Sequence, residues 1–169
     1  MTRAEILSYF LASRRDSVLL ELVEISHSAF SQVYRRVRNA RQGVTVTLET
    51  GVQATFSYYP MRISAQSDAA DLDNGLRIDF GDLGEILPRE LDNVRSQDAM
   101  GEKPVVIYRA YRSDNLAAPL LGPLRLEASN FAFKREGASF EATSPYINLN
   151  RTGETYNLTR FPTLRGYVK

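Results

Sequence analysis

The sequence predicts an α+β protein with a mainly antiparallel sheet, and three observations lead to that class. Residues Val105–Tyr111 are rich in β-branched and aromatic side chains, which favour strands. Residues Leu124–Ala128 alternate between apolar and polar side chains, as a strand with one buried face does. Thr2–Glu5 has the spacing of a helix capping box, and apolar residues at helical spacing follow it as far as Leu11. We therefore expect antiparallel strands, an N-terminal helix and one central helix.

Two more strands and the central helix follow from the pattern of apolar residues. Residues Ser17–Ile25 form a dense apolar run, and residues Gly75–Gly81 alternate in polarity, so both are predicted to be strands. Asp82 is placed to cap a helix whose last apolar position is Val94. Pro88 either kinks this helix or begins a second short one, because proline is tolerated in a first helical turn.

Two hairpins are expected to form the framework of the sheet. The first spans Val44–Ile63 and turns at Gly51, and the second spans Leu124–Ala142 and turns at Gly137. Pro60 cannot donate a hydrogen bond to a neighbouring strand, which places the end of the first hairpin at a sheet edge or a bulge. We expect a partly closed barrel or a sandwich and not an open sheet, because closure removes exposed edges.

The length of 169 residues predicts one domain. Residues 1–146 are assigned to a single β-rich domain. Residues 147–169 form a polar C-terminal tail of irregular pattern. Since this tail is neither of low complexity nor poor in charge, we expect it to be ordered at an interface.

The composition argues against several classes of function. A formal net charge of +1 gives no general attraction to nucleic acid or anionic lipid. The absence of cysteine excludes disulfides, thiolate nucleophiles and cysteine-bound clusters, and one histidine cannot form a metal site made of histidines alone. No apolar run is long enough to span a membrane, and the N-terminus lacks the basic region of a signal peptide, so synthesis in a cytosol is expected. No cofactor is predicted.

Two candidate chemical motifs fail on their spacing or their partners. Asp71–Gly75 resembles the start of a calcium loop, but glycine falls at position five instead of six, and position twelve is Asp82 instead of glutamate. A solvated acidic loop is the better interpretation. His27 is the only base available to a serine triad, and no Gly-x-Ser-x-Gly turn accompanies it. His27 is predicted to be a surface or edge residue.

One basic run is the only candidate for contact with nucleic acid, and it comprises Arg35, Arg36, Arg38 and Arg41 beside Tyr34. Arginine neutralises phosphate and tyrosine stacks on bases. The alternatives are arginines that face water or pair with acids, and arginines at a protein–protein contact. The first alternative is favoured, because the whole-chain charge is close to zero.

Three segments together resemble a known family: Leu76–Leu91, Asn130–Lys134 and Tyr156–Arg165. The chain is similar over essentially its whole length to uncharacterised tail proteins of bacteriophages with long, non-contractile tails and of related prophages. The resemblance implies a structural role in the tail tip, at the baseplate or hub, and a location in the virion after synthesis in the host cytoplasm. It brings no catalytic residues, so the chain is not expected to be an enzyme. Related hub proteins can carry a cysteine-bound cluster, which this chain without cysteine cannot hold.

The partners implied by the resemblance are other phage tail proteins, namely tube, tape measure, hub or fibre, and further copies of the chain in a trimeric or hexameric ring. Membrane and nucleic-acid partners are not expected. Two alternatives to a virion component stay open. One is a tail assembly factor that leaves the finished particle, and the other is an accessory of a cell-wall hydrolase.

Two segments are predicted to contact neighbouring subunits. The loop Leu116–Pro123 is apolar but contains two prolines, so it either covers the core or contacts another subunit. The tail combines tyrosine, phenylalanine and arginine, a mixture that interface cores favour. The predicted interface residues from these two segments are Leu116, Leu120, Leu121, Tyr156, Arg160, Phe161, Leu164, Arg165 and Tyr167.

Overall fold

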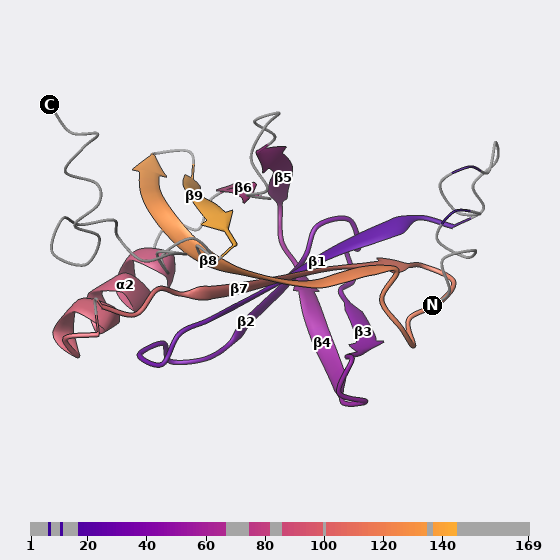
Figure 1. The fold of residues 1–169 in the computed structure, drawn as a ribbon, viewed down its shortest axis with the longest axis horizontal. Helices are drawn as coiled ribbons and strands as arrows, with labels where there is room; N and C mark the ends of the chain where they lie inside the picture. The colour runs from indigo at the N-terminus through magenta and orange to yellow at the C-terminus, as the bar shows by residue number, and fades with distance from the viewer. Residues whose placement is uncertain are drawn as a thin grey trace, which may run out of the picture.

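The computed structural model describes residues 17–66, 75–81, 86–99, 101–134 and 137–144, together with Leu7 and Leu11. Figure 1 shows the strands and the helix α2 (Ile86–Ser96) that these residues form. The strands are β1 (Leu19–Ser26), β2 (Tyr34–Val37), β3 (Val44–Thr47), β4 (Gln53–Tyr58), β5 (Met61–Gln66), β6 (Gly75–Gly81), β7 (Val105–Arg112), β8 (Leu121–Lys134) and β9 (Gly137–Thr143).

All nine strands belong to one hydrogen-bonded sheet, in the order β3-β4-β2-β1-β7-β8-β9-β6-β5. Every pairing in it is antiparallel except that of β2 with β4, which is parallel. The long pairing of β1 with β7 lies at the centre and runs without a register shift. Among the described strands, β3 and β5 are the two ends of the order and do not pair with each other.

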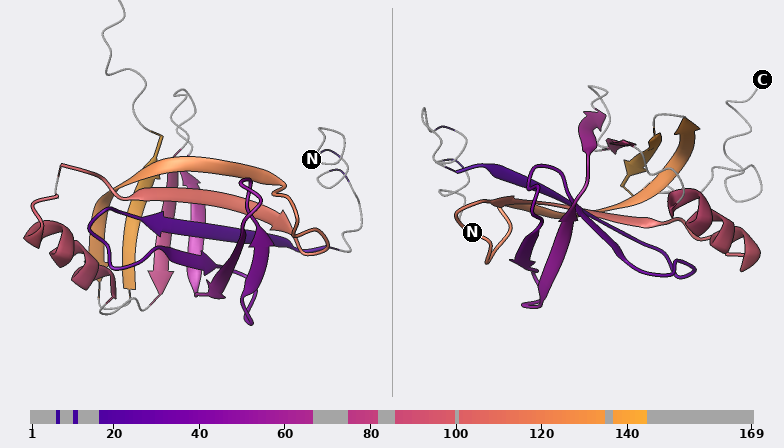
Figure 2. Two further views of the ribbon diagram at one scale, coloured as in Figure 1. Left: turned by 90° about the horizontal axis from the view of Figure 1, so that it is seen from below. Right: turned by 180° about the vertical axis from the view of Figure 1, so that it is seen from behind.

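The central pair β1–β7 has a hydrophobic core on each face. Alternate side chains of a strand point to opposite faces, so Val23 and Ile25 of β1 enter one core while Leu20 and Leu22 enter the other. In Figure 1, β5, β6 and β9 lie on one side of β1 and β7, and the β3–β4 hairpin lies on the other; Figure 2 shows the same arrangement from below and from behind.

The two cores are named here by the strands that cover them. The first core lies under β5, β6 and β9 and includes Val23, Ile25, Tyr34, Met61, Ile78, Phe80, Val106, Leu126, Ala128, Ala138, Phe140 and Ala142. The second core lies under the β3–β4 hairpin and consists of Leu20, Leu22, Val37, Val46, Ala54, Phe56 and Tyr111.

A bulge in β8 allows the sheet to curl over the first core. Its first part pairs with β7 and its second part with β9, and the register with β9 shifts between Ser129 and Ala132. Asn130 lies within this shift at a positive φ of 53°. A bulge of this kind bends its strand and increases the local twist. As a result, β9, β6 and β5 turn back over the face formed by β1, β7 and β8.

The predicted α+β class is wrong, because the described residues are mostly strand and contain a single helix. The mainly antiparallel character is confirmed. The predicted N-terminal helix is not among the described elements. Of its residues only Leu7 and Leu11 are described, and both side chains are exposed instead of buried in a core. Within these described residues, no helix is long and apolar enough to span a membrane.

The predicted closure into a barrel or a sandwich is also wrong, since the sheet stays open. Closure would require the end strands β3 and β5 to pair with each other, and they do not. The parallel pairing of β2 with β4, at Arg36–Ser57 and Val37–Tyr58, extends the sheet away from β5. The β3–β4 hairpin then continues the sheet on the opposite face of β1 and β7.

The first predicted hairpin is correct in its first part only. Strands β3 and β4 form a hairpin, and Gly51 lies in its turn at a φ of 81°. After Pro60 the chain continues as β5, which pairs with β6 instead of β3. The second predicted hairpin is confirmed, with Gly137 at a φ of 144° where β9 begins.

The strands predicted at Ser17–Ile25, Gly75–Gly81 and Val105–Tyr111 are confirmed as β1, β6 and β7. The central helix is confirmed as α2, and Pro88 lies in its first turn, where an N–H has no acceptor within the helix. The predicted cap at Asp82 lies outside the described residues.

We expect Phe56→Ala to destabilise the fold by about 3–5 kcal/mol, because Phe56 is fully buried at the centre of the second core. The control is Val52→Ala, since Val52 lies beside the same hairpin but is 60% exposed; its effect should stay within about 0.5 kcal/mol. Urea unfolding measures both. A loss below about 1 kcal/mol for Phe56→Ala would mean that the hairpin does not pack on β1–β7.

Candidate functional site

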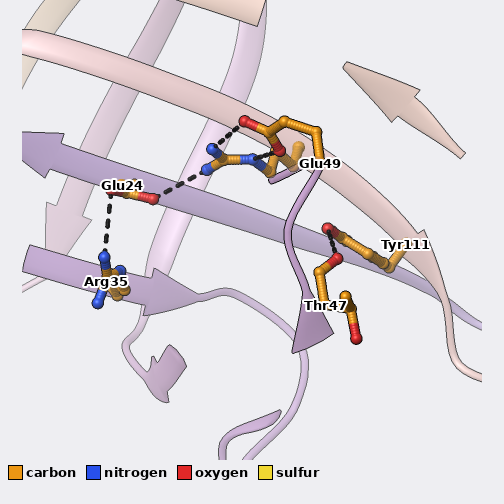
Figure 3. Close-up of polar contacts among 6 residues, drawn as sticks. Glu24, Arg35, Thr47, Glu49 and Tyr111 are labelled. Atoms are coloured by element: carbon orange, nitrogen blue, oxygen red, sulfur yellow. Dashed lines mark hydrogen bonds and ion pairs between the residues drawn. The ribbon is translucent and has the colours of Figure 1, made fainter. Parts of the chain in front are cut away.

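The most buried charge among the described residues is Arg109, on the second-core face of β7, with 2% of its surface exposed. Its Nε and Nη2 donate to the two carboxylate oxygens of Glu49 at 2.9 and 2.7 Å. Its Nη1 donates to Glu24 on β1 at 2.9 Å. Glu24 in turn lies 3.5 Å from Arg35 on β2, so one chain of alternating charges crosses the sheet (Figure 3).

This chain of contacts joins parts of the molecule that are distant in sequence. Glu49 lies in the turn of the β3–β4 hairpin, so its two bonds to Arg109 fix the hairpin to β7. Tyr111, on the same face of β7, donates to the carbonyl oxygen of Thr47 at 2.7 Å (Figure 3). The amide of Thr47 donates to the carbonyl oxygen of Leu116 at 2.9 Å. The hairpin is therefore held by β7 and by the loop that follows it.

The network also changes the acid–base properties of its members. The hydrogen bonds from Arg109 lower the pKa of Glu49 below its ordinary value, and the burial of that carboxylate is too slight to reverse the effect. Burial alone would lower the pKa of Arg109, but the bonds and charges of Glu49 and Glu24 raise it. The carboxylate of Glu49 thus stays charged at neutral pH and serves as an acceptor for Arg109. An arrangement of this kind fixes the position of the hairpin relative to β7.

A second polar cluster surrounds Glu90, a buried acid on the helix α2. Its carboxylate accepts hydrogen bonds from the amide of Ser31 at 2.9 Å, from Asn93 Nδ2 at 3.2 Å, and from the hydroxyls of Ser31 and Tyr34. Burial would raise the pKa of Glu90, but these hydrogen bonds outweigh it and lower the pKa. Four donors use the acceptor capacity of the carboxylate, so it anchors α2 instead of acting as a base.

Two of the hollows on the described surface are lined in part by polar residues. One, of about 500 Å³, lies beside the Glu90 cluster. The other, of about 370 Å³, lies across the ends of β5, β6 and β9, beside the paired glycines Gly81 and Gly137. Arg62, Asp79 and Ser139 are among the residues that line it. Neither hollow contains a histidine, and no group of three or more metal-binding side chains occurs among the described residues.

The structure describes only the three leucines among the predicted interface residues. Leu116 packs against the second core. Leu120 is buried, with 3% exposed, and its amide donates to Ala110 O at 2.7 Å. Leu121 is 37% exposed at the start of β8. The predicted tail residues lie outside the described part of the chain, and they are Tyr156, Arg160, Phe161, Leu164, Arg165 and Tyr167.

The residues tested for other chemistry have structural partners. His27 Nδ1 accepts from the Ala29 amide at 3.0 Å, which makes Nε2 the donor to the carbonyl oxygen of Glu102 at 3.0 Å. In the basic run, Arg35 pairs with Glu24, and Arg38 pairs with Glu21 at 2.5 Å. The guanidinium of Arg36 lies 5.8 Å from the ring centre of Tyr34 and 5.5 Å from that of Tyr59. Pairing with acids, the favoured interpretation, describes Arg35 and Arg38.

Sequence reasoning missed both buried charges, Arg109 and Glu90. A signal for Arg109 was present, because it interrupts an otherwise apolar stretch of β7 and shares a face with Tyr111. A charge in such a position requires a buried partner. Glu90 gave no comparable signal, because its helix is amphipathic and acids are common on such helices. Only the position of Ser31 and Tyr34 beside the helix identifies its role.

A family model described as a domain of unknown function, DUF1833, matches residues 5–134. The chain belongs to the DUF1833 family. No curated protein matches the chain. The DUF1833 match covers all strands from β1 to β8 and the helix α2, and therefore both the Arg109 network and the Glu90 cluster.

We expect Arg109→Met to destabilise the fold by about 3 kcal/mol at pH 7, because it leaves the carboxylates of Glu24 and Glu49 without their buried partner. The control is Arg125→Met, an exposed arginine on the adjacent strand β8. Its effect should stay within about 0.5 kcal/mol. Urea unfolding at a series of pH values measures both.

The pH dependence separates a charge effect from a packing effect. The pKa of Glu49 is lowered in the fold, so its ion pair stabilises the wild type above the ordinary value of 4.5. That stabilisation is lost as the pH falls through the lowered pKa. Protonation of Glu49 also removes its unpaired charge in the variant, so the difference in unfolding free energy between the two proteins should narrow from pH 7 to about pH 3. A gap that does not change with pH would contradict this account.

Proposed function

We propose that this DUF1833 chain is a structural component of the tail tip of bacteriophages with long, non-contractile tails. It assembles by protein–protein contacts with further copies and with other tail proteins such as tube, tape measure, hub or fibre. The resemblance of Leu76–Leu91, Asn130–Lys134 and Tyr156–Arg165 to phage tail proteins supports this role. The chain acts in the virion after synthesis in the host cytoplasm.

The observation that carries the proposal is a pair of exposed apolar side chains at one end of the central strands. Val18 precedes β1 and is 58% exposed, and Leu121 begins β8 and is 37% exposed. Both lie at the same end of the central strands, because Val18 bonds to Ser113 just after β7 and Leu121 pairs with Ala110. Exposed apolar side chains at one end of a sheet are available to a surface that binds another protein.

The way the β3–β4 hairpin is attached also supports a load-carrying role. Its turn is fixed by two charged hydrogen bonds from Arg109, which are stronger and more directional than apolar contacts alone. A subunit that transmits force between neighbours needs its projecting elements to keep one orientation. The proposed role depends on geometry and contact surfaces and requires no catalysis, so we propose that the chain is not an enzyme.

The first test is the protein content of purified particles. Mass spectrometry of virions from a phage that encodes this chain should detect it at a fixed ratio to the major tail protein. Its absence from infectious particles would favour the assembly factor. Zymography on peptidoglycan is the second measurement, and clearing by the purified chain would contradict a structural role.

The second test concerns the predicted contacts of the C-terminal tail. We expect Arg160→Glu with Arg165→Glu to prevent incorporation into tails, because reversing charge at a desolvated contact costs several kcal/mol. The control is the pair Arg160→Lys and Arg165→Lys, which keeps the charge and should assemble far better. Incorporation is measured by mass spectrometry of purified particles. Normal assembly of the glutamate variant would exclude these two arginines from the interface.

A further inference from the structure

The outer side of β5 presents a row of backbone groups with no partner among the described residues. In an antiparallel pair, opposite residues alternate between hydrogen-bonded and non-hydrogen-bonded pairs. The amide of Gly81 donates to Pro60 O at 3.0 Å, which makes this pair a hydrogen-bonded one. Counting along the register, Arg62 and Ser64 also bond to β6. The N–H and C=O groups of the residues between them must therefore point away from the sheet.

These outward groups belong to Met61, Ile63 and Ala65. The opposite end of the sheet differs from this edge. On β3, the amide of Thr47 donates to Leu116 O, and the carbonyl oxygen of Thr47 accepts from the Tyr111 hydroxyl. The loop after β7 therefore guards β3, while β5 has no such cover among the described residues.

We propose that β5 pairs with the β5 of a second copy of this chain, antiparallel and with Ile63 on the two-fold axis. This register is the one in which all three residues with outward groups, Met61, Ile63 and Ala65, have a partner. With Ile63 opposite its own copy, Met61 lies opposite Ala65 of the partner subunit. Every outward N–H then finds an outward C=O, which is the condition for an isologous strand contact.

The side chains of β5 are compatible with this register. On the inner face, Met61 is buried in the first core and Ile63 packs against it, so the contact extends an existing apolar surface. On the outer face, Arg62 lies opposite Ser64 of the partner subunit and not opposite another charge. Asp79 lies opposite Arg62 on β6, where it pairs with Arg77 at 3.3 Å.

The edge carries few of the features that usually prevent such pairing, and Arg62 is its one charged residue. Edge strands are commonly guarded by lysine, by proline or by a bulge. Residues Met61–Gln66 contain no lysine and no proline, and the pairing of β5 with β6 has no register shift. Pro60 lies just before the strand, where it limits the contact to β5 itself. The surface is thus specific in length and in register.

Hydrogen exchange of the intact wild-type chain tests the pairing directly. Sedimentation equilibrium from about 1 μM to about 1 mM should show a dimer forming. At the high end of this range, the amides of Met61, Ile63 and Ala65 should exchange at least about tenfold more slowly than at the low end. The amides of Arg62 and Ser64, which bond to β6, should be protected at every concentration.

Proline at position 65 gives the matched variant. Ala65→Pro removes an outward N–H without breaking a bond to β6, and Ala65 is exposed, so the monomer should unfold at the wild-type temperature. Its dimer should be at least about tenfold weaker. Ala65→Thr keeps the N–H and favours a strand, so it should dimerise like the wild type. If the proline variant fails to fold, exchange of the wild type still decides the question.

Three results would overturn the proposal. The first is a wild type that stays monomeric while the three outward amides exchange fast. The second is a dimer whose strength Ala65→Pro leaves unchanged, since the copies would then meet elsewhere. The third is a monomer with protected outward amides, because other residues of the same chain would then cover β5. All are measured on the purified chain, so they are separate from its presence in virions.

Discussion

The pairing of β1 with β7 is the interaction on which the rest of the structure depends. The two strands pair over their full length, from Leu19–Arg112 to Ser26–Val105, and carry a hydrophobic core on each face. A strand pair that is buried on both sides has no solvent face on which to place charge. The first core requires the curl of β8, β9, β6 and β5, and the second requires the β3–β4 hairpin. The curled strands and the hairpin are therefore both needed to bury the two faces of the β1–β7 pair.

The charged residues of this central pair had to find partners within the fold. Arg109 contacts Glu24 and Glu49, and Glu21 contacts Arg38 and accepts from the Tyr108 hydroxyl. Burial, together with the charge and hydrogen bond of Glu21, raises the pKa of Tyr108 and keeps it a donor. Leaving a buried charge unpaired costs more free energy than forming the ion pair gains. These contacts therefore favour one arrangement of the strands more than they add to stability. The position of the hairpin relative to β7 is set in this way.

Much of the strand content could be predicted from the sequence, but the topology could not. Strands β1, β6 and β7 follow from composition and alternation, which are local properties. The break at Pro60 is also local, but where the chain goes afterwards depends on β6 and β9, which come later in sequence. The barrel was expected on the general ground that edges are avoided. It failed because the parallel pairing of β2 with β4 places β3 instead of β2 at the end of the sheet, and no local pattern reveals a parallel pairing of that length.

The candidate site shows the same division between local and long-range information. An arginine inside an apolar strand predicts that some acid lies nearby, yet Glu49 lies in a turn 60 residues earlier in the chain. Three leucines in one loop looked equivalent, but Leu120 is buried, Leu116 packs on the second core and Leu121 is exposed. The difference arises because Leu116 and Leu120 are tied by backbone bonds to β3 and β7, whereas Leu121 already belongs to β8. The sequence singled out the loop Leu116–Pro123 as a whole, and only the pairing of strands distinguishes its three leucines.

An open sheet that curls in two directions still has two edge strands, here β3 and β5. At β3, the strand is short, and the loop at Leu116 bonds to its backbone. At β5, the residues that bond to β6 alternate with residues whose backbone groups face outward, and the inner side chains of Met61 and Ile63 already belong to a core. Covering this edge from within would need another strand beyond β5, which the order of described strands does not supply. Monomeric proteins usually protect such an edge from pairing with other chains, whereas a subunit of an assembly uses it as a contact. The asymmetry between the two edges therefore agrees with a protein whose sheet is completed by another chain.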